Sequence, residues 1–219
     1  MKLSGDQVNF SDEFSPFHLD VLKEIANIGA GHAATSLSKL LDNKIDMCVP
    51  SVKLAGFNEV MELAGGAETE VVSVMFRLEG DAPGLMFFIL SPQQADQFVT
   101  RMTGRKSYGQ NLNGRDEIGE SALRELGNIV VGSYLSALSD LTHVEVQLSV
   151  PFLTIDMAGA ILSSALVELA CDSDRALVIE TSLVETGPAN SSIDGCFFFL
   201  PDADSSAILL KSLGVLGSR

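Results

Sequence analysis

The sequence predicts an α/β domain of the α+β type, in which helices pack on a largely antiparallel sheet and two similar halves are related by a pseudo-two-fold axis. Two observations lead to this fold: an internal duplication, and the same order of helix and strand patterns in each copy. The composition agrees, because 46% of the 219 residues are apolar and 20% are charged, as in ordinary globular proteins. The chain is long enough to bury a substantial core.

The duplication runs without a gap through the first part of each half. Residues 19–50 align with residues 120–151 at a constant offset of 101, and ten aligned residues are identical. Residues 84–104 also resemble residues 195–214. A repeat of this length indicates a duplicated structural unit. We therefore divide the chain into an N-terminal tail (1–16), a first half (17–104), a polar linker containing Gly and Asn (105–116) and a second half (117–214).

Each half shows the same order of elements. Apolar residues recur with helical spacing at the start of each half, which predicts a long amphipathic helix. Pro50 interrupts the strand pattern that follows and should bend the chain, because proline in a sheet is confined to edges, ends and bulges. The expected order in the first half is a long helix (17–42), a strand (44–55), a short helix (57–64), two strands (71–79 and 84–90) and a closing helix (92–103). The second half repeats this order, with Pro151 in place of Pro50.

Charge and composition exclude several classes of partner and location. The formal net charge is −15, and such a surface repels nucleic acid and anionic membranes, whose binding depends on Lys and Arg. The longest apolar runs, such as residues 85–90, are too short to cross a bilayer, and the N-terminus is too polar for a signal peptide. The three cysteines show no disulfide framework. We therefore expect a cytoplasmic protein with no nucleic-acid partner and no membrane insertion.

A polar stripe on each long helix is the candidate functional site. The stripe of the first half consists of Asp20, Glu24, Asn27 and Gly31, and that of the second half of Ser121, Glu125, Asn128 and Gly132. Spacings of four, three and four residues place each set on one narrow face of a helix. Each face thus carries a carboxylate, a carboxamide and a glycine that leaves room for the close approach of another backbone.

Two features argue that these stripes are more than the solvated side of an amphipathic helix. Asn and Gly are poor residues for the middle of a helix, by roughly 0.7–1 kcal/mol each relative to Ala, yet both recur at the same register. In both copies a proline, Pro50 or Pro151, also follows the asparagine at the same distance. The pattern indicates two equivalent sites. By itself it leaves open whether they bind a partner or catalyse a reaction.

No other motif in the sequence competes with the stripes. His18, His32 and His143 are scattered, and no group of His, Cys, Asp or Glu has metal-ligand spacing. The nucleophile-elbow, dinucleotide-binding and P-loop motifs are also absent from the sequence. We therefore expect no metal site.

The pattern D/S-x3-E-x2-N-x22-P resembles the signature of the CheC/CheX/FliY family of phosphatases. Both copies match it completely, with Asp20, Glu24, Asn27 and Pro50 in the first and Ser121, Glu125, Asn128 and Pro151 in the second. Flanking segments such as NIGAGHAATSLSKLL also look like CheC, and the resemblance extends from about residue 17 to residue 214. One departure is NIVVGSY in the second copy, where the first reads NIGAGHA. The bulkier Val130, Val131 and Tyr134 of the second copy leave open whether both sites engage a partner equally. The small residues Gly29, Ala30 and Ala33 of the first copy are compatible with a larger loss of activity when that copy is mutated.

By this resemblance, the substrate is a phosphorylated CheY-type response regulator, whose active site holds the phosphoaspartate, a Mg²⁺ ion and a lysine. The resemblance implies that Asn27 and Asn128 hold the attacking water, because a carboxamide can accept from water and donate to a phosphoryl oxygen. Glu24 and Glu125 would pair with the regulator's lysine. The protein would need no cofactor of its own, because the regulator supplies Mg²⁺.

The resemblance also sets expectations for assembly. Both motif copies lie in one chain, so we expect a monomer whose two long helices are antiparallel and adjacent, with both Glu/Asn pairs exposed on one surface. The deamidase CheD is a further candidate partner, because CheC proteins can bind it. The alternative is a non-catalytic binding or scaffold module like the flagellar switch protein FliM, which would show no turnover.

Overall fold

The computed structural model describes residues 14–104, 117–169, 175–185, 192–202 and 205–216. The predicted linker (105–116) and all but the last three residues of the predicted tail (1–16) lie outside the described residues. Of those three, Phe14 is buried, Ser15 caps the first helix and Pro16 begins it.

The helices and strands follow the predicted order. The first half contains α2 (Pro16–Leu41), β1 (Ile45–Cys48), β2 (Val52–Gly56), α3 (Phe57–Leu63), β3 (Glu70–Gly80), β4 (Gly84–Leu90) and α4 (Pro92–Thr103). The second half contains α5 (Glu117–Thr142), β5 (Val146–Leu148), β6 (Phe152–Met157), α6 (Ala158–Leu169), β7 (Arg175–Glu185), β8 (Ser192–Pro201) and α7 (Ser205–Leu216). The one difference is that each strand expected to contain a proline is divided in two, because Pro50 and Pro151 lie in bends between shorter strands.

The strands of the two halves form one sheet, in which each half contributes two strands that pair with a strand of the other half. They follow the order β1-β7-β8-β4-β3-β5, with β2 also paired to β7 and β6 to β3. Every strand pairing that the structure describes is antiparallel, which confirms the predicted type of sheet. The strands after α2 thus pair with the second half, and the strands after α5 pair with the first. Each half therefore completes the sheet of the other.

The pseudo-two-fold axis passes through the central pair of strands, β4 and β8. Phe87 lies opposite Phe198, and these two residues are equivalent in the repeat. The next rings along these strands, Phe88 and Phe197, stack with their centroids 4.4 Å apart. The duplication in the sequence is thus a symmetry of the folded chain.

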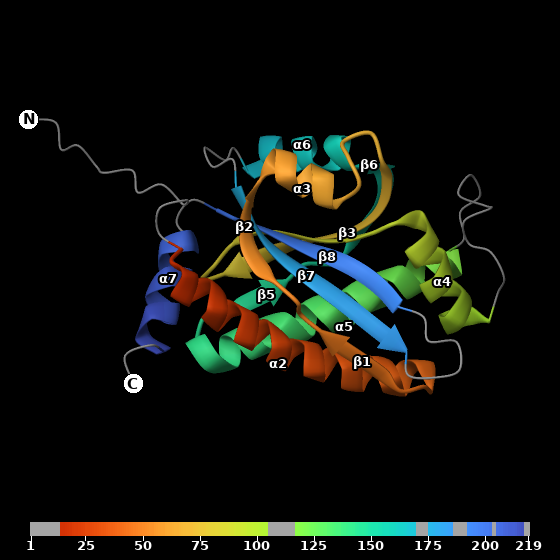
Figure 1. Ribbon diagram of the computed structural model, residues 1–219, viewed down its shortest axis with the longest axis horizontal. Helices are drawn as coiled ribbons and strands as arrows, with labels where there is room; N and C mark the ends of the chain where they lie inside the picture. The colour runs from red at the N-terminus through yellow and green to blue at the C-terminus, as the bar shows by residue number, and fades with distance from the viewer. Residues whose placement is uncertain (1–13, 105–116, 170–174, 186–191, 203–204, 217–219) are drawn as a thin grey trace, which may run out of the picture.

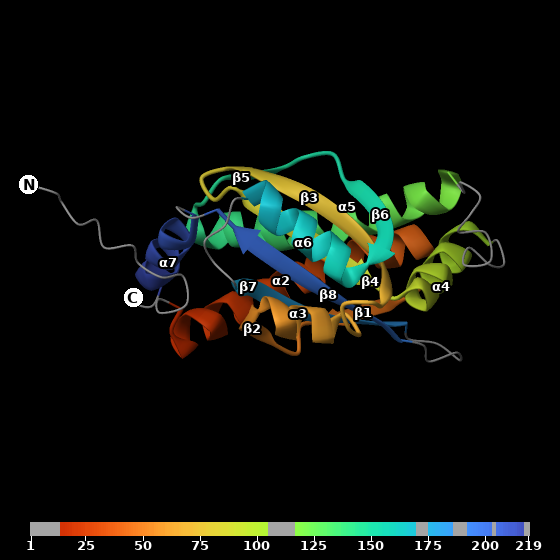
Figure 2. The same cartoon turned by 90° about the horizontal axis from the view of Figure 1, so that it is seen from above.

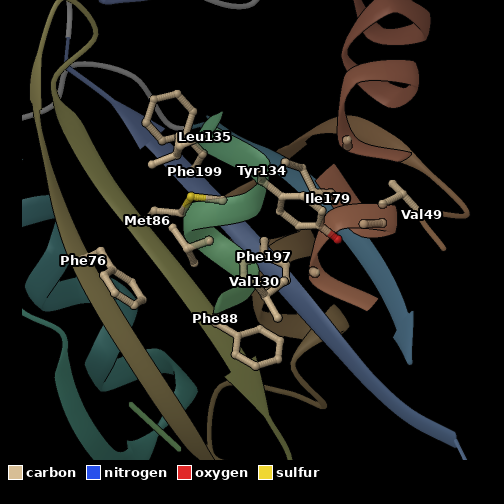
Figure 3. Close-up of a cluster of buried hydrophobic side chains, with 14 of the residues drawn as sticks. Val49, Phe76, Met86, Phe88, Val130, Tyr134, Leu135, Ile179, Phe197 and Phe199 are labelled. Atoms are coloured by element: carbon tan, nitrogen blue, oxygen red, sulfur yellow. The ribbon is translucent and has the colours of Figure 1, made fainter. Parts of the chain in front are cut away.

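The helices form a layer on each face of the sheet (Figure 1). Helices α2 and α5 run antiparallel and side by side over one face, as predicted, and α3 and α6 cover the other face (Figures 1 and 2). The larger of two hydrophobic clusters lies between the long helices and the sheet, and Figure 3 shows part of it. None of the helices in the described part of the chain is both long and apolar enough to span a membrane.

The two long helices pack closely because a glycine lies at their contact. A Cβ atom built on Gly29 of α2 would lie 2.8 Å from the Cα of Tyr134 and 2.9 Å from the carbonyl oxygen of Ser133, both in α5. No side chain fits at such distances, so Gly29 sets the spacing of the two helices. This spacing fixes how far apart the two polar stripes lie on the surface.

Candidate active site

The stripe of the first half lies on the outer side of α2. Asp20, Glu24 and Gly31 are exposed, as predicted, whereas Asn27 is half-buried. Glu24 forms no ion pair with any described residue. Its carboxylate is therefore available to a cation of another molecule.

The carboxamide of Asn27 is occupied by the protein's own backbone. Its Oδ1 accepts a hydrogen bond from the Val49 N–H at 3.0 Å, and its Nδ2 donates to the Lys23 carbonyl oxygen at 3.0 Å. The prediction that both Glu/Asn pairs are solvent-exposed holds for Glu24, Glu125 and Asn128, whereas Asn27 is only half-exposed. The reason is that α2 packs against β1, and this brings the start of the bend within reach of the side chain.

The bend itself explains the fixed distance between the asparagine and the proline in the motif. Cys48 pairs with Ser182 and Val52 with Ile179, so three residues (49–51) lie opposite two (180–181). Such a bulge bends the strand and leaves a backbone group without a ladder partner. Asn27 supplies that partner to Val49, and Pro50, which has no N–H to satisfy, follows.

The stripe of the second half is more open. Ser121, Glu125 and Asn128 are exposed and Gly132 is half-buried. The Asn128 carboxamide makes no hydrogen bond to any described residue. Arg124, the cation next to Glu125, is paired with Glu120 at 3.0 Å, and Glu125 has no ion-pair partner within the described ranges. Both functional groups of this copy are therefore free to contact another molecule.

The second bend has the same register as the first but a different set of contacts. Pro151 is half-buried, and residues 149–151 lie opposite residues 76–77. Here Ser149 holds the bend, since its N–H donates to the Arg77 carbonyl oxygen and its Oγ accepts from the Arg77 N–H, both at 2.9 Å. Val150 is 87% exposed, whereas its equivalent Val49 is 2% exposed.

The glycines of the stripes are not required by packing within the protein. A Cβ atom built on Gly31 would meet nothing within 4 Å, and one built on Gly132 would lie 3.9 Å from the Leu148 Cδ1, an ordinary contact. Neither residue has a positive φ. We still predict that these glycines leave room for the backbone of a partner protein.

A depression beside the second stripe was not predicted from the sequence. Its lining residues come from the end of α4 and the start of α5: Met102, Thr103, Glu117, Ile118, Ser121, Ala122 and Glu125. Glu117 lies four residues before Ser121, so continuing the stripe by one more turn would have identified it.

The exposed carboxylates and carboxamides define what the site can do. Within the described residues, no group of three or more His, Cys, Asp or Glu side chains could hold a metal ion. A glutamate and an asparagine one turn apart on a convex helix surface can enter the cleft of another protein. The carboxamide could orient a water and a phosphoryl oxygen there, and the carboxylate could pair with a cation.

Comparisons with known proteins agree with this geometry. The model of the CheC-like family matches residues 17–54 and 118–155, which contain both motif copies. The chain is 43% identical over 196 residues to the CheY-P phosphatase CheC of Bacillus subtilis (strain 168), covering 90% of this chain and 93% of that protein. It is 28% identical over 140 residues to the flagellar motor switch phosphatase FliY of the same organism, covering 64% of this chain and 36% of that protein.

A solved structure shows the same fold. The crystal structure of FliY from Thermotoga maritima has a TM-score of 0.72 at 23% identity and covers 93% of this chain and 98% of that chain. The predicted domain of two similar halves is therefore confirmed as a known architecture.

Proposed function

The chain belongs to the CheC-like family, and from this premise we propose that it is a phosphatase that hydrolyses the aspartyl phosphate of a CheY-type response regulator in chemotaxis. The observation that carries the proposal is the complete pair of motif copies on the exposed faces of two adjacent helices. The relative that is 43% identical over 90% of the chain is itself a CheY-P phosphatase.

The reaction requires a water in line with the scissile P–O bond and stabilisation of the charge on the phosphoryl oxygens. The asparagine of a motif copy enters the regulator's active site. There its Oδ1 accepts from the attacking water and its Nδ2 donates to a phosphoryl oxygen. Its contribution is positioning, which lowers the entropic part of the barrier. Asn27 and Asn128 are the candidates for this role.

The glutamate of the same copy fixes the orientation of the complex. Glu24 and Glu125 lie one turn before the asparagines, and each is exposed. A charge-assisted hydrogen bond to the regulator's lysine would set the docking register and hold the asparagine over the phosphate. Mg²⁺ comes with the regulator, so this protein needs no cofactor of its own.

The proposal extends to assembly and location. One chain contains both motif copies, so a monomer is sufficient for function. CheD is a further candidate partner, and a chemotaxis response regulator as substrate supports a cytoplasmic location.

The test is the decay of a phosphorylated CheY-type regulator with and without catalytic amounts of this protein. A phosphatase clears many regulator molecules per molecule of protein. A scaffold or binding module alters the decay only in proportion to its own concentration, and that result would reject the proposal.

A further inference from the structure

We propose that the two motif copies have different roles: Asn128 carries most of the turnover, and Asn27 acts mainly as a positioning residue that holds the bend at Val49 and Pro50. The assignment of turnover rests on the proposed function. The holding of the bend stands on the structure alone and has its own test.

The two carboxamides differ in their hydrogen bonding. Catalysis needs the side-chain oxygen to accept from water and the side-chain nitrogen to donate to a phosphoryl oxygen. In the first copy both atoms of Asn27 are already bonded, to Val49 and to Lys23. In the second copy Asn128 is exposed and makes no such bond within the described part of the chain.

The two bends are also held by different side chains. In the second copy, Ser149 bonds to the backbone of Arg77 through both its N–H and its hydroxyl. The equivalent residue in the first copy, Cys48, also pairs with its strand partner, Ser182, but its thiol is a weak acceptor and does not replace the hydroxyl of Ser149. The first bend therefore uses Asn27, whereas the second bend is secured without Asn128.

Tyr134 lies beneath the first bend and has no counterpart beneath the second. The hydroxyl of this buried residue of α5 shares a 2.9 Å hydrogen bond with the hydroxyl of Thr181, one of the two residues opposite the bulge. Figure 3 shows the ring among the core side chains, with its hydroxyl directed away from α5 toward the strands. The equivalent residue under the second bend is Ala33, whose side chain cannot form a corresponding hydrogen bond to the strand. The first bend is thus fixed from two sides.

The hydrogen bonds of Asn27 allow the difference in turnover between the two sites to be estimated. Asn27 must release two hydrogen bonds before it can enter a regulator's active site. At the usual net strength of such bonds, the released state is disfavoured by roughly tenfold to thirtyfold. The first site should therefore contribute about a tenth of the total turnover or less. This reverses the order suggested by the small residues of the first motif, because the sequence does not show the two hydrogen bonds that hold Asn27.

The experiment compares two matched pairs of variants, Asn27→Asp with Asn128→Asp and Asn27→Ala with Asn128→Ala. An aspartate at position 27 retains an oxygen that can accept from the Val49 N–H, which preserves the bend at Val49 and Pro50. It lacks the NH₂ group. Turnover is measured with a CheY-type regulator phosphorylated by a small-molecule phosphodonor, and stability is measured by thermal unfolding followed by circular dichroism.

We expect Asn128→Asp and Asn128→Ala to lose about nine-tenths of the turnover with Tm unchanged. Asn27→Asp should lose about a tenth of the turnover. Asn27→Ala should lower Tm by about 4–10 °C, because the buried Val49 N–H loses its acceptor.

Two results would overturn the inference. One is a folded Asn27→Asp protein that loses as much turnover as Asn128→Asp. The other is a Tm for Asn27→Ala equal to that of the native protein. If the native protein itself fails to accelerate the decay, the proposed function is rejected, while the Tm comparison still decides whether Asn27 holds the bend.

Discussion

Replacing Gly132 with alanine should have opposite effects on the stability of the protein and on its binding of the regulator. Gly132 lies in the interior of α5, where glycine costs about 0.5–1 kcal/mol relative to alanine. The added methyl group would meet only the Leu148 Cδ1, at 3.9 Å. The substitution should therefore raise the free energy of unfolding by about 0.5–1 kcal/mol and Tm by about 1–4 °C.

The same methyl group should impair docking. It would stand on the exposed stripe, next to Asn128, where we expect the regulator's backbone to approach. A methyl group forced into a close contact costs about 1–3 kcal/mol, so KM for the phosphorylated regulator should rise at least about fivefold. Turnover is measured as a function of regulator concentration, and unfolding is followed by circular dichroism.

Gly31→Ala is the matched control, since a Cβ atom there would meet nothing within 4 Å. It should raise Tm by a similar amount with a smaller effect on KM. If Gly132→Ala were more stable and KM did not change, the glycine would not serve the approach of a partner. A lower Tm for Gly132→Ala would contradict the prediction that the added methyl group fits without a clash.

The structure also leads to predictions for Gly29, Tyr134 and Glu125 and for the metal content of the protein. Gly29→Ala should lower the free energy of unfolding by about 1–3 kcal/mol, because its Cβ atom would clash with α5; urea denaturation measures this. Burial raises the pKa of Tyr134 above its ordinary value of 10.0, so the neutral form is favoured in the folded state and stability should fall as pH rises past that value. Tyr134→Phe should remove this part of the pH dependence and cost about 1 kcal/mol at neutral pH through the lost bond to Thr181. Glu125→Gln should raise KM about tenfold and weaken its dependence on salt, with less effect on kcat, because a charged contact to the regulator is lost. Elemental analysis of the purified protein should find no stoichiometric metal, and activity should depend on Mg²⁺ added with the regulator.

Much of the fold could be predicted because the duplication appears in local patterns. Helical periodicity located both long helices, and the prolines located the bends at Pro50 and Pro151. The exchange of strands between the halves could not be predicted, because the pairing of β1 with β7 depends on contacts between residues more than 130 positions apart. Periodicity shows which face of a strand is buried but not which strand lies beside it.

The sequence predicted which residues form the candidate site, but not which of their side chains are hydrogen-bonded within the protein. The helical spacing brought each glutamate and asparagine onto one face, as the structure shows. The distance from Asn27 to Pro50 was visible in the sequence as a repeated interval, but its cause, the bond to Val49, is a tertiary contact. From the sequence alone, Tyr134 is one of the bulky residues next to the second motif. In the structure its ring points inward and its hydroxyl lies beneath the first bend.

The most direct test of the account is multiple-turnover dephosphorylation by a protein carrying both Asn27→Ala and Asn128→Ala. Circular dichroism establishes that the variant is folded at the assay temperature, which must lie below the lowered Tm expected for Asn27→Ala. We expect the native protein, at catalytic amounts, to clear a large excess of phosphorylated regulator, while the folded double variant leaves the spontaneous decay unchanged. A folded double variant that turns over at the native rate would contradict the assignment of catalysis to the asparagines.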